Sequence, residues 1–175
     1  MKMKVKFGIV GCGRIGSRHA QRVFENKRAE LVAVCDIDKK KTDAICKKYD
    51  CHAFYDFNDI LNEKLDVLNI CTPSGMHAEM SIKALEKFHV LCEKPMTLNL
   101  YDADRVIDVE KRTGNKFFLV KQNRYNPPIM ALKDAVIKEK IGKITFVNCN
   151  VLWNRRKDYY ENDPWKGTMA LDGGA

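Results

Sequence analysis

The sequence has no long apolar run, and this absence excludes several classes of protein. Its first apolar segment lasts about four residues before glycines interrupt it, which is too short for the hydrophobic region of a signal peptide or for a membrane span. Internal repeats, low-complexity tracts and linkers rich in proline and glycine are absent too. Hydrophobic residues make up 45% of the chain and charged residues 31%, a balance typical of proteins that bury a core. We therefore expect a globular, cytoplasmic protein without a membrane segment.

Cysteine shows no pattern that indicates a disulfide framework or a metal site. The seven cysteines are an odd number, and most lie inside apolar runs, unlike the loop cysteines of disulfide-rich proteins. Cys46 and Cys51 are the closest pair, but their spacing is not that of a standard zinc site and no second pair complements them. We expect reduced, mostly buried thiols and no metal.

The formal net charge of +8 raises the question of a nucleic-acid partner. The lysines, however, are scattered along expected helix faces with acidic residues between them, as in 39–50 and 103–114. That distribution is typical of solvated helices. A phosphorylated or acidic small substrate accounts for the charge more economically, and we expect no nucleic-acid partner.

Short apolar runs alternate with longer amphipathic stretches as far as about Val120. The apolar runs cover residues 5–10, 31–36, 66–72, 89–94 and 116–121. The amphipathic stretches cover residues 17–26, 39–49, 77–87, 100–114 and 129–140, and a minor strand with a short connection is expected within 52–61. Continuous apolar runs of this length suit strands that are buried on both faces of a parallel sheet, with helices crossing between them. The pattern predicts a doubly wound α/β fold.

Several residues mark the expected ends of these helices. Asp38 and Asn99 are suited to cap helix N-termini, and Gly114 follows two basic residues where a helix should end. Asp56 or Asn58 can cap the short connection after the minor strand.

The pattern changes at Gln122. Two prolines precede a helix, and residues 142–154 read as one long strand of alternating side chains. Such alternation is typical of a half-exposed antiparallel sheet. One or two strands cannot form a stable sheet by themselves, so the chain looks truncated. We predict a first domain over residues 1–121 and the incomplete start of a second, α/β and mostly antiparallel domain over residues 122–175.

Gly11, Gly13 and Gly16 form a GxGxxG motif directly after the first apolar run and at the start of a helix. In this context the first glycine permits a tight turn, the second leaves room for a pyrophosphate and the third lets the helix lie close to the strand. The amides at the helix start, including those of Arg14 and Ile15, would face the phosphates. The motif predicts a Rossmann domain that binds a dinucleotide.

Asp36 ends the second apolar run, twenty positions after Gly16. A carboxylate at this position can accept both ribose hydroxyls of NAD and would repel the additional phosphate of NADP. The lysines at 39–41 could in principle hold that phosphate, although a solvated helix start is the simpler interpretation. We expect NAD as the cofactor, with NADP as the less favoured alternative.

The segment after the strand at 66–72 brings further polar groups to the carboxyl edge of the sheet, where ligands bind in open α/β folds. Thr72 and Pro73 would shape a turn beside the cofactor. His77 falls in the first turn of the next helix, where it should stay neutral and could hydrogen-bond to cofactor or substrate. The alternative is a surface or capping histidine.

Glu93 and Lys94 end the following strand on the same side of the sheet, and Pro95 restricts the backbone beside them. Charges at this point are costly to half-bury without a purpose. Near the positive nicotinamide ring, Lys94 could exchange a proton with a substrate hydroxyl. Glu93 would orient Lys94 or contact the nicotinamide ribose. The alternative is a plain surface turn.

The chain contains, in this order, the glycine motif, Asp36 and the segments CTPSGMHAE, EKP and QNRYNP. In this order and at this spacing, the motifs resemble those of the Gfo/Idh/MocA family of oxidoreductases. The resemblance covers essentially the whole chain, and the joint pattern is far more specific than any single motif. It implies an NAD-binding Rossmann domain at 1–121 and the start of a substrate and oligomerisation domain at 122–175. Members typically oxidise a hydroxyl of a sugar or cyclitol with NAD or NADP, and commonly form dimers or tetramers.

The motifs and the resemblance together assign roles to residues. Lys94 would be the catalytic or hydroxyl-positioning lysine, and the family's second catalytic histidine would follow Ala175. The residues expected to contact the cofactor are Gly11, Gly13, Arg14, Ile15, Gly16, Asp36, Thr72, Pro73, His77, Glu93, Lys94, Gln122 and Trp165. The residues expected to contact the substrate are Lys94, Asn123, Arg124, Arg155, Arg156, Tyr159 and Tyr160.

The basic and aromatic segment 153–175 is similar to the WlbA- and WbpB-type branch of the family. Members of this branch oxidise C3 of UDP-N-acetyl-2-amino-2-deoxyglucuronate in surface-polysaccharide synthesis. The resemblance therefore implies an NAD-dependent oxidoreductase of a UDP-sugar. The alternatives are a dehydrogenase of inositol or another simple sugar, and a non-catalytic nucleotide-binding module. The 175-residue chain itself is expected to bind NAD without turnover.

Overall fold

The computed structural model describes residues 3–174 and divides the chain into two units. The first unit contains residues 3–120 and 165–174, and the second contains residues 121–164. The domain boundary predicted from the sequence lies between residues 121 and 122, with residues 122–175 in the second domain. In the structure the residues from Trp165 onward belong to the first unit.

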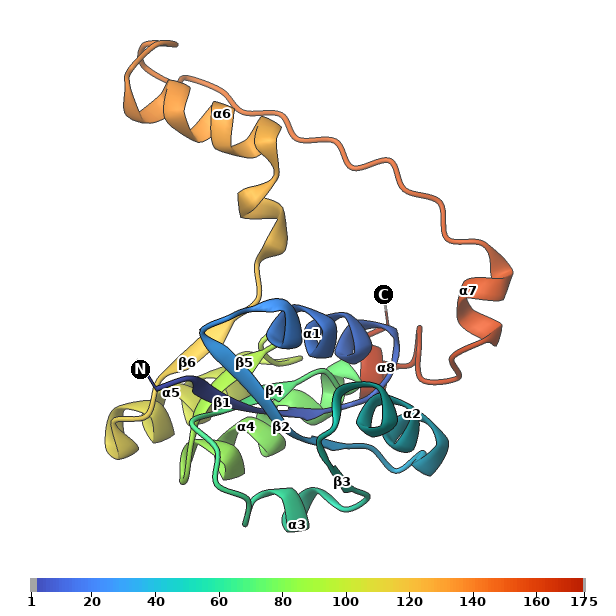
Figure 1. Cartoon of the computed structure of the whole chain (residues 1–175). Helices are drawn as coiled ribbons and strands as arrows, with labels where there is room; N and C mark the ends of the chain where they lie inside the picture. Colours follow the sequence, from blue (N-terminus) through green and yellow to red (C-terminus); the bar gives the residue numbers. More distant parts are fainter. Residues whose placement is uncertain (1–2, 175) are drawn as a thin grey trace. The chain divides into compact units, whose positions relative to one another are not determined.

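Six strands form one sheet in the first unit (Figure 1). They are β1 (Val5–Val10), β2 (Ala29–Cys35), β3 (His52–Phe54), β4 (Val67–Ile70), β5 (His89–Cys92) and β6 (Phe117–Leu119). Their order is β3-β2-β1-β4-β5-β6, and every pairing is parallel. This order confirms the predicted doubly wound α/β fold. The order in which the strands follow one another reverses direction between β1 and β4. Open α/β sheets bind ligands at such a point.

Helices cover both faces of this sheet. Residues of α1 (Arg14–Glu25) and α2 (Lys39–Tyr49) contribute to one core cluster. Residues of α3 (Phe57–Ile60), α4 (His77–Leu85) and α5 (Leu100–Thr113) contribute to the other. The two clusters lie on opposite faces because successive strand residues point to opposite sides, as Ile9 and Val10 do.

The predicted helix caps are confirmed. The side chain of Asp38 accepts hydrogen bonds from two amides at the start of α2, and that of Asn99 accepts one at the start of α5. Asp56, one of the two candidates, caps α3. Gly114 ends α5 with a φ of 75°, in the left-handed region where glycine carries no steric penalty.

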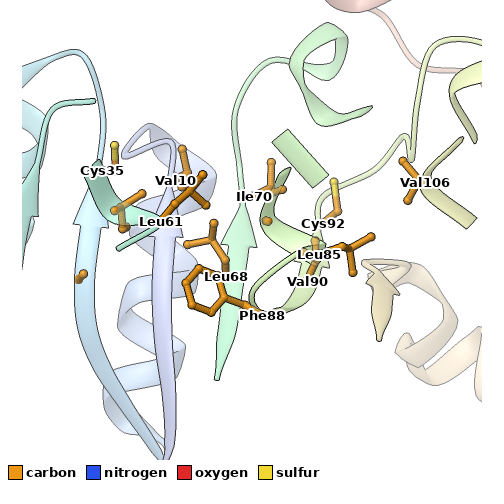
Figure 2. Packing of buried hydrophobic residues seen from close by; sticks show 13 residues of the cluster. Val10, Cys35, Leu61, Leu68, Ile70, Leu85, Phe88, Val90, Cys92 and Val106 are labelled. Atoms are coloured by element: carbon orange, nitrogen blue, oxygen red, sulfur yellow. The ribbon is translucent and has the colours of Figure 1, made fainter. Parts of the chain in front are cut away.

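Leu68, at the centre of β4, is fully buried in the cluster shown in Figure 2. We expect Leu68→Ala to lower the free energy of unfolding by about 2–5 kcal/mol, because the lost side chain leaves a cavity. Leu100→Ala is the matched control, since Leu100 is 84% exposed, and it should change stability by less than about 0.5 kcal/mol. Urea unfolding of the variants measures both effects. Equal destabilisation by the two substitutions would contradict this description of the core.

The second unit contains η2 (Gln122–Tyr125), α6 (Pro127–Ile137) and α7 (Lys157–Glu161). The two prolines form the first positions of α6, where a missing amide hydrogen removes no helical hydrogen bond. The predicted strand at 142–154 is wrong, because these residues adopt no regular structure. A strand requires a neighbour to pair with, and no described segment pairs with this one. Its apolar side chains, including Phe146 and Leu152, are exposed.

Within residues 3–174, no helix is long and apolar enough to cross a membrane, and no three His, Cys, Asp or Glu side chains are placed to hold a metal ion. The cysteines are free thiols. Burial raises the pKa of Cys12, Cys35 and Cys92 to about 12, which keeps these thiols protonated at neutral pH.

Candidate functional site

The glycine turn lies at the carboxyl end of β1, and two glycines determine its conformation. Gly11 has a φ of 92°, a backbone conformation that residues other than glycine rarely adopt. A β-carbon on Gly16 would lie 1.7 Å from the carbonyl oxygen of Gly11. Helix α1 can therefore approach the turn this closely only if residue 16 has no side chain.

Gly13 differs, because the protein itself does not require its missing side chain. A β-carbon on Gly13 would meet nothing within 4 Å. Gly13 is also the N-cap of α1, which has no side-chain cap and no acidic residue in its first turn. The amides and positive dipole of this helix end are therefore open to an anion. Open space beside uncapped amides fits the diphosphate of a dinucleotide.

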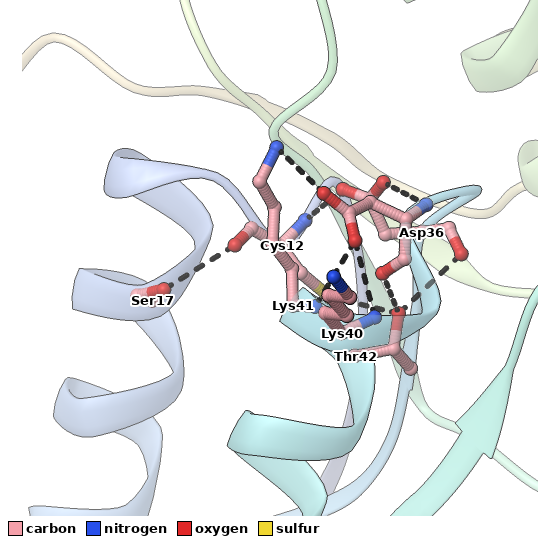
Figure 3. Close-up of polar contacts among 7 residues, drawn as sticks. Cys12, Ser17, Asp36, Lys40, Lys41 and Thr42 are labelled. Carbon is pink, nitrogen blue, oxygen red and sulfur yellow. Dashed lines mark hydrogen bonds and ion pairs between the residues drawn. The ribbon is translucent and has the colours of Figure 1, made fainter.

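Asp36 follows β2 and supports the glycine turn. Its Oδ2 accepts a hydrogen bond of 2.7 Å from the amide of Cys12, and its Oδ1 accepts one of 2.9 Å from the amide of Asp38 (Figure 3). A carboxylate offers about four acceptor positions, so Asp36 can hold the turn and still accept ribose hydroxyls. The ribose contact of Asp36 is a prediction from the sequence, whereas its link to the turn is seen only in the structure.

The lysines at the start of α2 make contacts within the protein. Lys41 forms an ion pair of 3.2 Å with Asp38, and the Nζ of Lys39 lies 5.1 Å from the ring centre of Tyr55. Such contacts are typical of a solvated helix start, the simpler of the two interpretations of these lysines.

Thr72 and Pro73 follow β4 and lead into the short helix η1 (Ser74–Met76). His77 begins α4, but its ring is only 1% exposed. Its Nδ1 lies 2.7 Å from the carbonyl oxygen of Pro95, and its Nε2 lies 2.9 Å from that of Thr72. A neutral ring donates to one of these carbonyls and a doubly protonated ring donates to both. This ring was predicted from the sequence to hydrogen-bond to cofactor or substrate. In the structure it instead bridges two backbone turns, because it fills the space between them.

Glu93 and Lys94 lie at the carboxyl end of β5. Because β1, β4 and β5 are parallel neighbours, these residues share one edge of the sheet with the glycine turn. The side chain of Lys94 is exposed. The Oε1 of Glu93 lies 2.8 Å from the Nε2 of His19 on α1, and its Oε2 accepts a hydrogen bond from the amide of Lys94 at 3.2 Å.

The carboxyl group of Glu93 is held in its charged form. Burial raises its pKa, but the hydrogen bond from His19, the charge of His19 and the contacts with Lys94 together outweigh burial. The pKa of Glu93 therefore lies below its ordinary value. The contact of His19 with Glu93 was not predicted from the sequence. The available signal was its position one helical turn after Gly16, on the stripe of α1 that also contains the buried Ala20.

The segment that begins at Trp165 contains a helix that lies against the turn that follows β4. Helix α8 (Met169–Asp172) contacts η1, where a β-carbon on Gly75 would lie 2.0 Å from the carbonyl oxygen of Ala170. The side chain of Thr168 caps α8. Trp165, a predicted cofactor contact, is the first residue of this segment of the first unit.

The other predicted ligand residues lie in the second unit. They are Gln122, Asn123 and Arg124 in η2, and Arg155, Arg156, Tyr159 and Tyr160 in and before α7. The guanidinium of Arg155 stacks on two rings, at 3.7 Å from the centre of Trp153 and 4.7 Å from that of Tyr159. The rings of Tyr159 and Tyr160 meet edge to face. These basic and aromatic residues thus form one local cluster.

Comparison with known proteins identifies relatives of this chain. Residues 5–121 match the oxidoreductase family GFO_IDH_MocA, described by its NAD-binding Rossmann fold. The inositol 2-dehydrogenase of Salmonella typhimurium strain LT2 is 34% identical over 152 residues, which cover 83% of this chain and 45% of the relative.

Two solved structures are similar over nearly the whole chain. The WlbA dehydrogenase from Chromobacterium violaceum, in complex with NADH and UDP-GlcNAcA, has a TM-score of 0.94 and 35% identity, and the match covers 98% of this chain and 51% of that one. The WlbA dehydrogenase from Bordetella pertussis, with the same two ligands, has a TM-score of 0.92 and 34% identity, over 97% of this chain and 53% of that one.

The chain spans about half the length of these relatives. The family match includes all six strands of the sheet, the glycine turn and the turn that carries Lys94. The chain therefore belongs to the Gfo/Idh/MocA family of oxidoreductases, whose NAD-binding Rossmann fold is formed here by residues 5–121.

Proposed function

We propose that this chain carries the cofactor-binding part of an NAD-dependent dehydrogenase that oxidises a sugar hydroxyl, at C3 of a UDP-N-acetylaminosugar uronate. The observation that carries the proposal is the shared carboxyl edge of the sheet, where Lys94 at the end of β5 and the glycine turn at the end of β1 lie on either side of β4. The similarity to two WlbA dehydrogenases with bound NADH and UDP-GlcNAcA supports the choice of substrate.

NAD, when bound, accepts a hydride from the carbon that is oxidised. The residues of this chain supply binding, orientation and proton transfer. The amides around Gly13 hold the diphosphate, and Asp36 accepts the ribose hydroxyls. The amine of Lys94 holds the substrate hydroxyl and accepts its proton. Lys94 thus contributes to the rate through orientation of the substrate and general base catalysis.

In the second unit, the cluster around Arg155 would contribute to substrate binding. A guanidinium suits a diphosphate because it is planar and always charged, and aromatic rings suit a nucleobase or a sugar face. We also infer that the full-length protein forms a homo-oligomer, and that the 175-residue chain binds NAD without turnover.

The alternative within enzymes is a dehydrogenase of inositol or another simple sugar, which the 34% identity to inositol 2-dehydrogenase favours. A substrate panel assayed with a full-length enzyme that carries this chain separates the two. The proposal expects turnover of the UDP-N-acetylaminosugar uronate and little turnover of inositol or glucose. The reverse preference would establish the alternative.

Asp36 offers a test of cofactor choice in the chain itself. We expect Asp36→Asn to reduce the preference for NAD over NADP at least about tenfold, because the charge that repels the 2′-phosphate is removed. The single amide oxygen of asparagine can still accept the hydrogen bond from Cys12, so the glycine turn keeps this contact, while the hydrogen bond from the amide of Asp38 is lost. Calorimetric titration with both cofactors measures the ratio. An unchanged ratio would show that Asp36 does not select the cofactor.

A further inference from the structure

Two histidines contact the turn that carries Lys94. His19 on α1 contacts the side chain of Glu93 at 2.8 Å, and His77 on α4 contacts the carbonyl oxygen of Pro95 at 2.7 Å. Helices α1 and α4 belong to the core clusters on opposite faces of the sheet. The residues on either side of Lys94 are therefore held from both faces.

Each histidine also links the turn to another part of the cofactor edge. The second ring nitrogen of His77 contacts the carbonyl oxygen of Thr72 at 2.9 Å, which ties the turn after β5 to the turn after β4. His19 lies on the helix whose first turn follows Gly13. Through Glu93, which accepts the amide of Lys94, His19 connects that helix to the lysine backbone.

Both contacts are shielded from water. The ring of His77 is 1% exposed, and the side chains of His19 and Glu93 are 21% and 15% exposed. A buried polar contact that is lost leaves its partner unsatisfied, so such contacts restrain the backbone more than surface pairs do.

We propose that His19 and His77 are positioning residues, which fix the turn at residues 93–95 so that the Lys94 amine is held at the cofactor edge. This inference rests on the proposed function of Lys94. Neither histidine needs to contact the reacting groups, because each acts through the backbone or side chain next to the lysine.

Hydrogen exchange of the 175-residue chain tests the proposal without any substrate. We expect His77→Ala and His19→Ala to accelerate exchange of the amides in residues 93–98 about tenfold, since a lost buried hydrogen bond has an effect of that size. His19→Gln should restore protection to within about twofold of the wild type, because its amide nitrogen can still donate to Glu93. If His77→Ala does not fold, the His19 pair still decides the outcome.

His52→Ala is the matched control, since His52 forms a 2.8 Å pair with Glu63 at the far edge of the sheet and is well exposed. This variant should leave residues 93–98 unchanged. Wild-type exchange in His19→Ala, or equal acceleration in His52→Ala, would overturn the proposal.

Activity of a full-length enzyme gives an independent readout. His19→Ala should lower kcat about tenfold at an unchanged KM for NAD, because a displaced lysine impairs orientation more than cofactor binding, and His19→Gln should recover most of the rate. If instead Lys94→Met left oxidation intact, the proposed function would fail, while the exchange result would still decide whether the histidines hold the turn.

Discussion

Gly13→Val is expected to weaken NAD binding at least about 100-fold, or about 2.7 kcal/mol, while the melting temperature of the chain changes by less than about 2 °C. The side chain would occupy the open space beside the first amides of α1, where the diphosphate must approach the backbone. The fold should tolerate it, because the backbone of Gly13 is extended and a β-carbon there meets no protein atom within 4 Å. Calorimetric titration and thermal unfolding measure the two effects.

Gly16→Ala provides the contrast. Its β-carbon would collide with the carbonyl oxygen of Gly11, so this variant should lose stability as well as NAD binding. The pair separates a glycine that the ligand requires from one that the fold requires. Gly13→Val with wild-type affinity would mean that the dinucleotide does not lie over this turn.

Lys94→Met is expected to lower kcat of a full-length enzyme about 10³-fold, within the range of general acid–base catalysis. Methionine keeps much of the length of the side chain but cannot accept the proton of the substrate hydroxyl. NAD binding to the 175-residue chain should change less than about threefold, since the glycine turn and Asp36 supply most of the contacts. Steady-state kinetics and calorimetry test the two statements.

Lys83→Met is the control, because Lys83 is an exposed lysine in the last turn of α4, and its kinetics should match those of the wild type. Full activity of Lys94→Met would instead support the alternative of a nucleotide-binding module in which the ligand does not react.

Local patterns predicted the first unit well. The strands β1, β2, β4 and β5 are apolar runs buried on both faces, so their composition alone indicates a parallel sheet. The cap at Asp38 and the helix end at Gly114 depend on neighbouring residues only. Gly11 and Gly16 are required by the backbone itself, which is why the motif identifies the turn.

Contacts between distant residues were not predicted. His19 and Glu93 are 74 positions apart, and no local pattern pairs them. His77 was correctly predicted to lie in the first turn of a helix, but it was also expected to contact the ligand. The sequence does not show that the backbones of Thr72 and Pro95 approach its ring. The docking of α8 on Gly75 is likewise a long-range contact. The prediction of a strand at 142–154 was wrong for the same reason. The alternation of its side chains indicates an amphipathic segment, but it does not show whether another strand pairs with it.

The proposed choice of a UDP-sugar over a simple sugar rests in part on residues of the second unit. Its cluster around Arg155 is organised by stacking between neighbours in sequence, which explains why the basic and aromatic pattern could be recognised. The identity of the substrate depends on the geometry of the residues that contact it, which composition alone does not describe.

We propose that the glycine turn and Lys94 share one NAD site on the carboxyl edge of the sheet. Titration of the isotopically labelled 175-residue chain with NAD, followed by the amide signals of its residues, tests this most directly. If they share one site, the signals of residues 11–16 and of Lys94 should shift together and saturate at one NAD concentration. Shifts confined to a different part of the chain, or none at about 1 mM NAD, a concentration that detects weak binding, would contradict it.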